Sequence, residues 1–103
     1  MRKITYKAIV AFEQNRPFTS GNTAVKVDDK CGVPETGLYL HGHKIAYKLN
    51  GTLFIDACGW LTNTTKERLN GIDGVSINQK DYQWFLNGRQ WGGSLVAVDG
   101  FGI

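Results

Sequence analysis

Two Asn-Gly dipeptides constrain the fold of this chain more than any other feature. Asn50-Gly51 and Asn87-Gly88 favour the two-residue turn that joins antiparallel strands, because both residue types readily adopt a positive φ. Apolar and polar side chains alternate over residues 44–49, just before the first dipeptide, and residues 52–58 suit the return strand. The sequence therefore predicts antiparallel hairpins built from short strands.

Other turn signals extend this pattern in both directions. Gly42-His43 suits a tight turn, and Lys80-Asp81 is expected to reverse the chain again. Residues 28–37 are polar and contain Gly and Pro, so we expect a loop there. Further strands are predicted over residues 23–27, 38–41, 75–78, 82–86, 89–91 and 95–98.

The N-terminal segment is predicted to be a helix that ends before Pro17. Apolar side chains recur there at helical spacing, at Ile4, Ala8, Ile9 and Phe12. The alternative is a strand, because Ile9, Val10 and Phe12 also suit a sheet.

A second, short helix is predicted after Trp60. Thr64-Thr65-Lys66-Glu67 matches a capping box, in which the Thr64 hydroxyl and the Glu67 carboxylate each accept from the other residue's backbone N–H. Gly71 is expected to end the helix in a left-handed conformation. Because so short a helix is not stable alone, Leu69 should anchor it to the sheet.

These elements predict a single α+β domain over residues 1–103, with an antiparallel sheet of about five to seven short strands. The N-terminal helix and the short helix after Trp60 should both cover one face of that sheet. The core is expected to contain Ile4, Ile9, Phe12, Val25, Leu38, Leu40, Ile45, Tyr47, Phe54, Leu69, Ile77 and Trp84.

Composition limits the classes of function. The chain has 103 residues, two cysteines and a net charge of +3, with its cations spread along the sequence and no run of five. Its first residues lack the apolar segment of a signal peptide, and no apolar run nears the ~20 residues that span a bilayer. We therefore expect a cytoplasmic protein with reduced thiols and no cofactor; a disulfide between Cys31 and Cys58 is the alternative.

The hairpin around Asn87-Gly88 carries the first candidate binding surface, which consists of Tyr82, Trp84, Arg89 and Trp91. Exposed aromatic and arginine side chains are typical of protein-binding hot spots and of platforms that stack single-stranded nucleic acid. The alternative is that Trp84 and Trp91 pack on each other inside the fold. If the surface binds a partner, replacing Arg89 and Trp91 should abolish binding without changing the melting temperature.

Trp60, Lys66 and Arg68 form a second candidate surface. Two cations near the N-terminus of a helix suit a phosphate group, because the unpaired backbone N–H groups there attract anions. The alternative is an ordinary solvated helix face.

Metal binding and cysteine catalysis are weaker interpretations. His41 and His43 could ligate a metal together with Cys31, Cys58 or Asp56, but a polar turn also explains both histidines. Neither cysteine lies in a frame typical of metal sites or of cysteine hydrolases. We therefore predict neither a metal site nor enzymatic activity.

Three stretches of the sequence together indicate a relationship to known proteins: Phe18–Val25, Leu38–Ala46 and Gly59–Gly71. The third is the most specific, because Gly59-Trp60 is followed by a Thr-rich cap and Glu-Arg-Leu-Asn. In order and spacing these stretches resemble a group of short proteins encoded by tailed bacteriophages. The resemblance covers residues 4–91 and implies a phage accessory protein made inside a bacterium. It carries over no functional residues, and Cys58 stands where the group usually has a small residue such as Ala.

Together these observations predict a non-enzymatic phage accessory protein that binds a host or phage protein, for example one of host defence or metabolism. The alternative is a small basic DNA- or RNA-binding protein that uses its Lys and Arg residues and exposed aromatics. We expect a monomer or a homodimer.

Overall fold

A computed structural model describes residues 2–30 and 32–100, and the predicted α+β fold is confirmed within them. The helices are α1 (Lys3–Glu13) and α2 (Asn63–Asn70), followed near the C-terminus by a short 3-10 helix, η1 (Val98–Gly100). The strands are β1 (Phe18–Ser20), β2 (Thr23–Lys30), β3 (Val33–Leu40), β4 (His43–Leu49), β5 (Thr52–Ile55), β6 (Ile77–Lys80), β7 (Gln83–Leu86), β8 (Arg89–Gln90) and β9 (Val96–Ala97).

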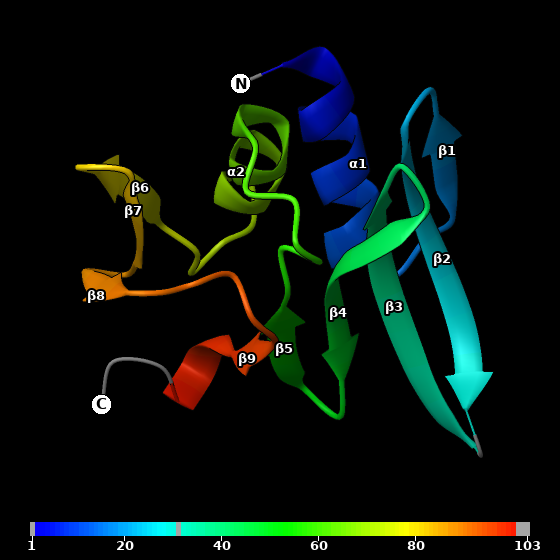
Figure 1. Ribbon diagram of the computed structural model, residues 1–103. Helices are drawn as coiled ribbons and strands as arrows, with labels where there is room; N and C mark the ends of the chain where they lie inside the picture. The colour runs from blue at the N-terminus through cyan, green and yellow to red at the C-terminus, as the bar shows by residue number, and fades with distance from the viewer. Residues whose placement is uncertain (1, 31, 101–103) are drawn as a thin grey trace.

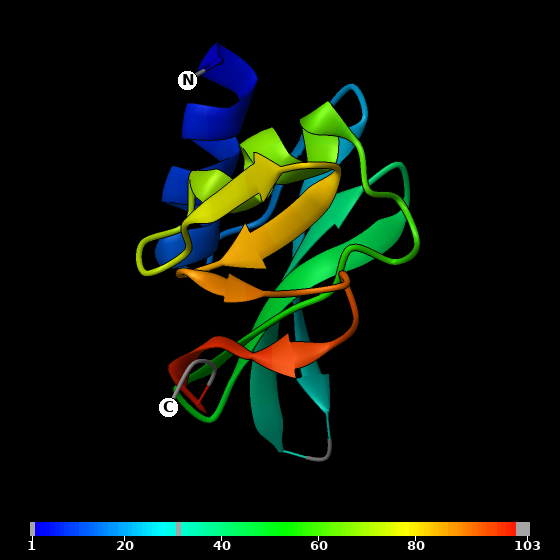
Figure 2. The same ribbon diagram turned by 60° about the vertical axis from the view of Figure 1, so that its left-hand side comes forward.

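The strands form two antiparallel sheets rather than the single sheet expected. The larger sheet has the order β1-β2-β3-β4-β5-β9, and the smaller has the order β6-β7-β8. Helix α1 packs on β1, β2 and β3, while α2 contacts α1, β4 and β6. Both helices lie on one face of the larger sheet, and α2 lies between α1 and the smaller sheet (Figure 1). Turned by 60°, the smaller sheet lies in front of the helices (Figure 2).

Both Asn-Gly turns are confirmed, and two other predicted turns are wrong by one residue. Asn50 and Asn87 have φ values of 53° and 50°, each followed by a glycine with positive φ. The turn before β4 is His41-Gly42, and the turn between β6 and β7 is Asp81-Tyr82. Because tight hairpin turns need positive φ at both central residues, the less usual His41 and Tyr82 must adopt that conformation.

The predicted loop over residues 28–37 is wrong. Strand β2 continues to Lys30 and β3 begins at Val33, with Asp28 paired to Glu35 across the hairpin. Cross-strand pairing overrides the low strand propensity of these polar residues. The turn-rich stretch after Pro17 likewise contains β1, a short edge strand that pairs with the start of β2.

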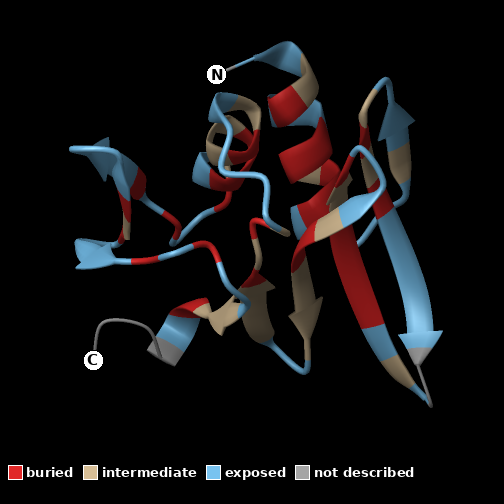
Figure 3. Ribbon diagram, in the orientation of Figure 1, coloured by how far each residue is buried: buried red, intermediate tan, exposed pale blue. Residues whose placement is uncertain are grey.

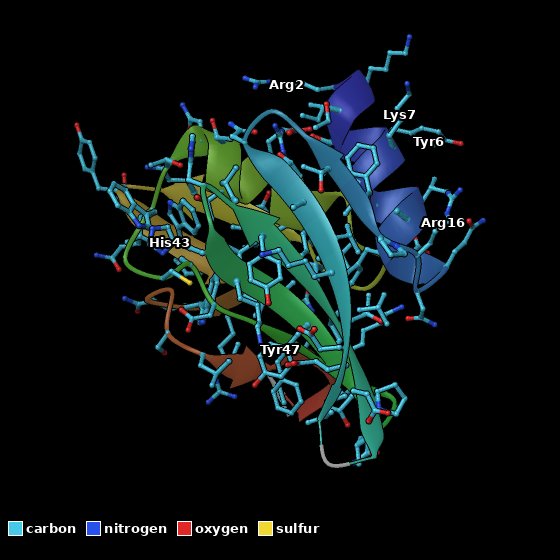
Figure 4. The ribbon with its side chains drawn as sticks, turned by 90° about the vertical axis from the view of Figure 1, so that its right-hand side faces the viewer. Arg2, Tyr6, Lys7, Arg16, His43 and Tyr47 are labelled. Atoms are coloured by element: carbon cyan, nitrogen blue, oxygen red, sulfur yellow. The ribbon has the colours of Figure 1, made fainter. Side chains whose placement is uncertain are left out.

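Most of the predicted core is confirmed, including Trp84, and the buried residues gather where α1 and α2 meet the larger sheet (Figure 3). Ile4, Tyr47 and Phe54 are only half-buried. A register shift at Leu38/Tyr39 turns Ala46 towards the core, so Tyr47 lies on the outer face of the sheet. There its ring stacks on that of Phe54 at 4.8 Å; Figure 4 shows Tyr47 on this face.

Both ends of α2 differ from the sequence prediction. Thr62 is the N-cap, and its hydroxyl accepts from the backbone N–H of Thr65. Gly71 ends the helix with φ of −73°, not in the left-handed region. A Cβ at Gly71 would lie 2.8 Å from Ile9 Cγ1, so the glycine allows the close approach of α1 rather than a special turn.

Candidate functional site

A groove of about 300 Å³ lies between the β3–β4 turn and the start of α2. Its strand side is formed by Leu40, His41, His43 and Ile45, and its helix side by Trp60, Thr62, Thr64 and Thr65. The backbone N–H of His41 donates to the Asn22 carbonyl at 2.8 Å, which fixes the turn at one end of the groove. The sequence candidates His41, His43 and Trp60 are thus brought together by segments far apart in the sequence.

Next to the groove two consecutive apolar side chains, Trp60 and Leu61, are exposed, and Leu95 is exposed on the segment that follows Gly93; we call these three residues the Trp60 patch. Their exposed fractions are 55%, 51% and 54%. The segments that carry them are joined, because Ala57 N–H donates to the Gly93 carbonyl at 2.8 Å. A Cβ at Gly93 would also lie 2.8 Å from Leu61 Cδ2, so Leu61 packs closely on that segment.

The His43 ring, on β4 of the larger sheet, contacts the indole of Trp60. Their ring centroids are 5.8 Å apart, with the planes tilted by 39°. This contact gives the exposed tryptophan a defined position at the rim of the groove, and it gives His43 a role that needs no metal. In residues 2–30 and 32–100, no group of three or more His, Cys, Asp and Glu side chains is placed to hold a metal ion.

The first candidate surface is not an exposed aromatic patch. Trp84 and Trp91 are both buried and pack on each other, with ring centroids 6.3 Å apart. The Trp91 indole N–H donates to the Ser94 carbonyl at 2.9 Å. Tyr82 and Arg89 are exposed, but they lie at opposite ends of β7. The packing alternative is therefore correct for the two tryptophans.

The second candidate surface is also separated by the fold, because Arg68 is buried whereas Trp60 is exposed. Its guanidinium donates to Thr23 Oγ1 at 3.1 Å and to Thr5 Oγ1 at 2.7 Å, and it pairs with the Glu67 carboxylate. These contacts join α2 to α1 and β2. The expectation that Arg68 binds a phosphate is wrong, because its donors face buried hydroxyls and its charge is matched by Glu67.

Lys66 lies on the other side of α2, towards the smaller sheet. Its ammonium group donates to Gln79 Oε1 at 3.1 Å and lies 5.9 Å from the centre of the Trp84 ring. It therefore covers the hairpin and does not contribute to the groove. Of the second set, only Trp60 belongs to the candidate site.

Glu67 is the acidic member of the buried cluster. Its carboxylate accepts from the Thr5 hydroxyl, from the backbone N–H of Arg2 and from Arg68. Burial raises the pKa of Glu67, but these hydrogen bonds and the charge of Arg68 outweigh it, so the net pKa lies below its ordinary value of about 4.5. The capping-box role predicted for Glu67 is replaced by these contacts with α1.

Acid should weaken the fold through this carboxylate. Because the folded-state pKa of Glu67 is depressed, its stabilising contribution is fully present above the unfolded pKa and is lost as the pH falls through the folded pKa. We expect the melting temperature to fall more steeply between about pH 5 and pH 3 in the wild type than in Glu67→Gln. Circular dichroism melts at several pH values would measure this, and equal slopes would contradict it.

Cys58 is a free thiol, and Cys31 lies outside the described residues. The Cys58 Sγ donates to the Lys44 carbonyl at 3.2 Å. Burial and the nearby Asp56 charge raise the pKa of this thiol, which lowers its thiolate fraction at neutral pH. The environment of Cys58 is therefore that of a structural cysteine rather than of an activated nucleophile.

Sequence reasoning missed Leu61 and Leu95, and for Leu61 a signal was present. A hydrophobic residue before the N-cap usually packs on the fourth helical residue. With Thr62 as N-cap, that fourth residue is Lys66, which cannot complete the apolar contact. This mismatch indicates that Leu61 is exposed only once Thr62 is known to be the N-cap, whereas the sequence prediction had placed the cap at Thr64. Leu95 has no comparable signal.

Comparisons with known proteins place the chain in one family. The family model described as Kyanoviridae Gp96 protein matches residues 1–99. No curated protein and no solved structure matches the chain. Across the described part of the chain, neither helix combines the length and the apolar composition that a bilayer crossing requires. Because the match spans almost the whole sequence and agrees with the phage resemblance of its motifs, the chain belongs to the Kyanoviridae Gp96 family of phage proteins.

Proposed function

We propose that this phage protein is a non-enzymatic accessory protein that binds another protein, of the host or of the phage, through the Trp60 patch. The observation that carries the proposal is the exposure of two consecutive large apolar side chains, Trp60 and Leu61, at the rim of a groove of about 300 Å³. Clustered exposed apolar residues beside a concavity are typical of interaction sites, and tryptophan is enriched among binding hot spots.

The composition of the patch favours a protein partner. Trp60, Leu61 and Leu95 offer apolar area, and none of the three carries a charge that would attract a polyanion. The neighbouring threonine hydroxyls and His43 supply a polar rim on the groove side. An apolar centre with a polar rim is the usual arrangement of a protein–protein interface.

Affinity capture with the full chain as bait tests the proposal. The tagged wild type and the Trp60→Ala/Leu61→Ala variant would be incubated with bacterial host lysate, with nuclease and at two salt concentrations. We expect a stoichiometric protein partner on the wild type and at least ~30-fold weaker binding by the variant, the effect of losing a hot spot. Tyr82→Ala, which removes a fully exposed aromatic elsewhere, should bind like the wild type.

Two results would contradict the proposal. Equal capture by the wild type and the double variant would show that the partner binds elsewhere. Recovery of nucleic acid alone, lost on nuclease treatment, would show that the Trp60 patch is not the main binding surface.

A further inference from the structure

The net positive charge of this protein arises entirely from its first sixteen residues. Arg2, Lys3, Lys7 and Arg16 stand there against one acid, Glu13. The rest of the chain contains eight basic and eight acidic residues, so it is neutral overall. The sequence spreads its cations evenly, but it spreads its acids unevenly, and the net charge of +3 therefore belongs to α1 and the turn after it.

All four of these cations are exposed. Within residues 2–30 and 32–100, none of their side chains forms an ion pair with a carboxylate. Two carboxylates lie nearby: Glu13 at the end of α1, and Glu67, whose charge is already matched by Arg68. The outer face of α1 is therefore a basic surface that nothing in the described chain neutralises.

The position of the cations runs against the stability of α1. The first turn of this helix has no acidic residue, and it begins with Arg2 as N-cap followed by Lys3. Cations near the positive end of a helix dipole destabilise it, by about 0.3–1 kcal/mol each. Residues that break a local rule of helix stability are expected at functional sites.

An exposed aromatic ring lies among these charges. Tyr6 is 63% exposed, and Figure 4 shows Tyr6, Lys7 and Arg16 projecting from one side of the molecule, while Arg2 extends the other way from the start of α1. A groove of about 310 Å³ runs along this side, lined by Tyr6, Lys7, Val10, Ala11, Arg16, Pro17 and Phe18. His43, next to the Trp60 patch, lies at the opposite side of this view. The basic surface and the Trp60 patch are thus separate.

We propose that this basic face of α1 binds single-stranded nucleic acid. Lys7 and Arg16, which line the groove, suit phosphate groups, and Lys3 lies about 6 Å from Lys7 along the helix axis. Tyr6 offers its ring for stacking of an unpaired base, and Val10, Pro17 and Phe18 give the groove apolar walls. A duplex has no unpaired base to place there, so the aromatic groove favours a single strand. This inference does not depend on the proposed function of the Trp60 patch.

Fluorescence anisotropy of a labelled oligo(dT) of about 20 nucleotides tests the proposal with the full chain between about 50 and 200 mM salt. Each phosphate contact contributes a slope of about −0.7 to log K against log salt, so Lys3→Gln/Lys7→Gln should reduce the slope by about 1.4. The matched control, Lys80→Gln/Arg89→Gln, removes two exposed cations from the smaller sheet and should leave the slope unchanged. Tyr6→Ala should weaken binding about 5- to 150-fold, whereas Tyr6→Phe should not.

Melting temperatures of these surface variants should match the wild type, so that lost binding is not lost folding. Three outcomes would overturn the proposal. The wild type could fail to bind oligo(dT) even at low salt. The control pair could change the slope as much as the α1 pair, which would mean that binding follows total charge. A duplex of the same length could compete as well as the unlabelled single strand, which would refute recognition of an unpaired base.

Discussion

Arg68→Ala should lower the free energy of unfolding by about 3–5 kcal/mol, the loss expected when one partner of a buried ion pair is removed. The side chain is 1% exposed and is among the largest fully buried side chains. Its removal leaves a cavity, and it leaves the Thr5 and Thr23 hydroxyls and the Glu67 carboxylate without their shared donor. Since domains of this size have a total stability of about 5–15 kcal/mol, the variant should lose at least about a fifth of it.

Urea unfolding followed by circular dichroism would measure this loss. Arg89→Ala is the matched control, because Arg89 is exposed on β8 and its replacement should change stability by less than about 0.5 kcal/mol. Arg68→Lys should recover only part of the stability, because an ammonium group cannot reproduce the planar set of donors. If Arg68→Ala were as stable as Arg89→Ala, the buried cluster would contribute nothing to the fold.

Trp91→Ala should also destabilise the protein, by about 3–5 kcal/mol, as expected for truncation of a buried tryptophan. Trp91 is buried, packs on Trp84 and donates its indole N–H to Ser94. For a chain of about 100 residues this loss lowers the melting temperature by about 10–40 °C. The expectation from sequence that replacing Arg89 and Trp91 leaves the melting temperature unchanged is therefore reversed by the burial of Trp91.

Trp60→Ala provides the comparison, because Trp60 is more than half exposed and has the same side chain. Its melting temperature should stay within a few degrees of the wild type, since its ring contact with His43 joins two exposed side chains. Differential scanning fluorimetry of the two variants would show the contrast. Equal destabilisation would mean that Trp60 is part of the core and not of a binding surface.

The features that the sequence predicted correctly are those that depend on residues close together along the chain. The turns predicted at Asn50-Gly51 and Asn87-Gly88 were correct, because Asn and Gly readily adopt a positive φ whatever their surroundings. The helix at residues 3–13 was correct because its apolar stripe lies within one element. The α+β class followed from these two features.

Long-range contacts account for what the sequence did not predict. Arg68 looks like a solvated helix residue until its partners, 45 and 63 positions away, are known. Glu67 fits a capping box in the sequence, but its carboxylate instead accepts hydrogen bonds from Thr5 and Arg2. The N-cap of α2 is Thr62. The polar residues 28–30 form strand only because β3 pairs with them. Of the residues singled out from the sequence, His41, His43 and Trp60 meet at one groove, although the sequence had assigned them to different candidate sites.

The buried cluster of Arg68 also bears on how long the folded molecule persists. Hairpins between neighbouring strands close short loops, whereas Arg68 joins segments that are distant along the chain, and closing long loops carries a larger entropic cost. The hydrogen bonds of Arg68 are therefore expected to form after the transition state during folding and to break before the transition state during unfolding. Interactions absent from the transition state act on the unfolding rate rather than on the folding rate. The contacts of Arg68 between α2, α1 and β2 should therefore act mainly on the unfolding rate, and so on how long the folded protein resists unfolding and proteolysis.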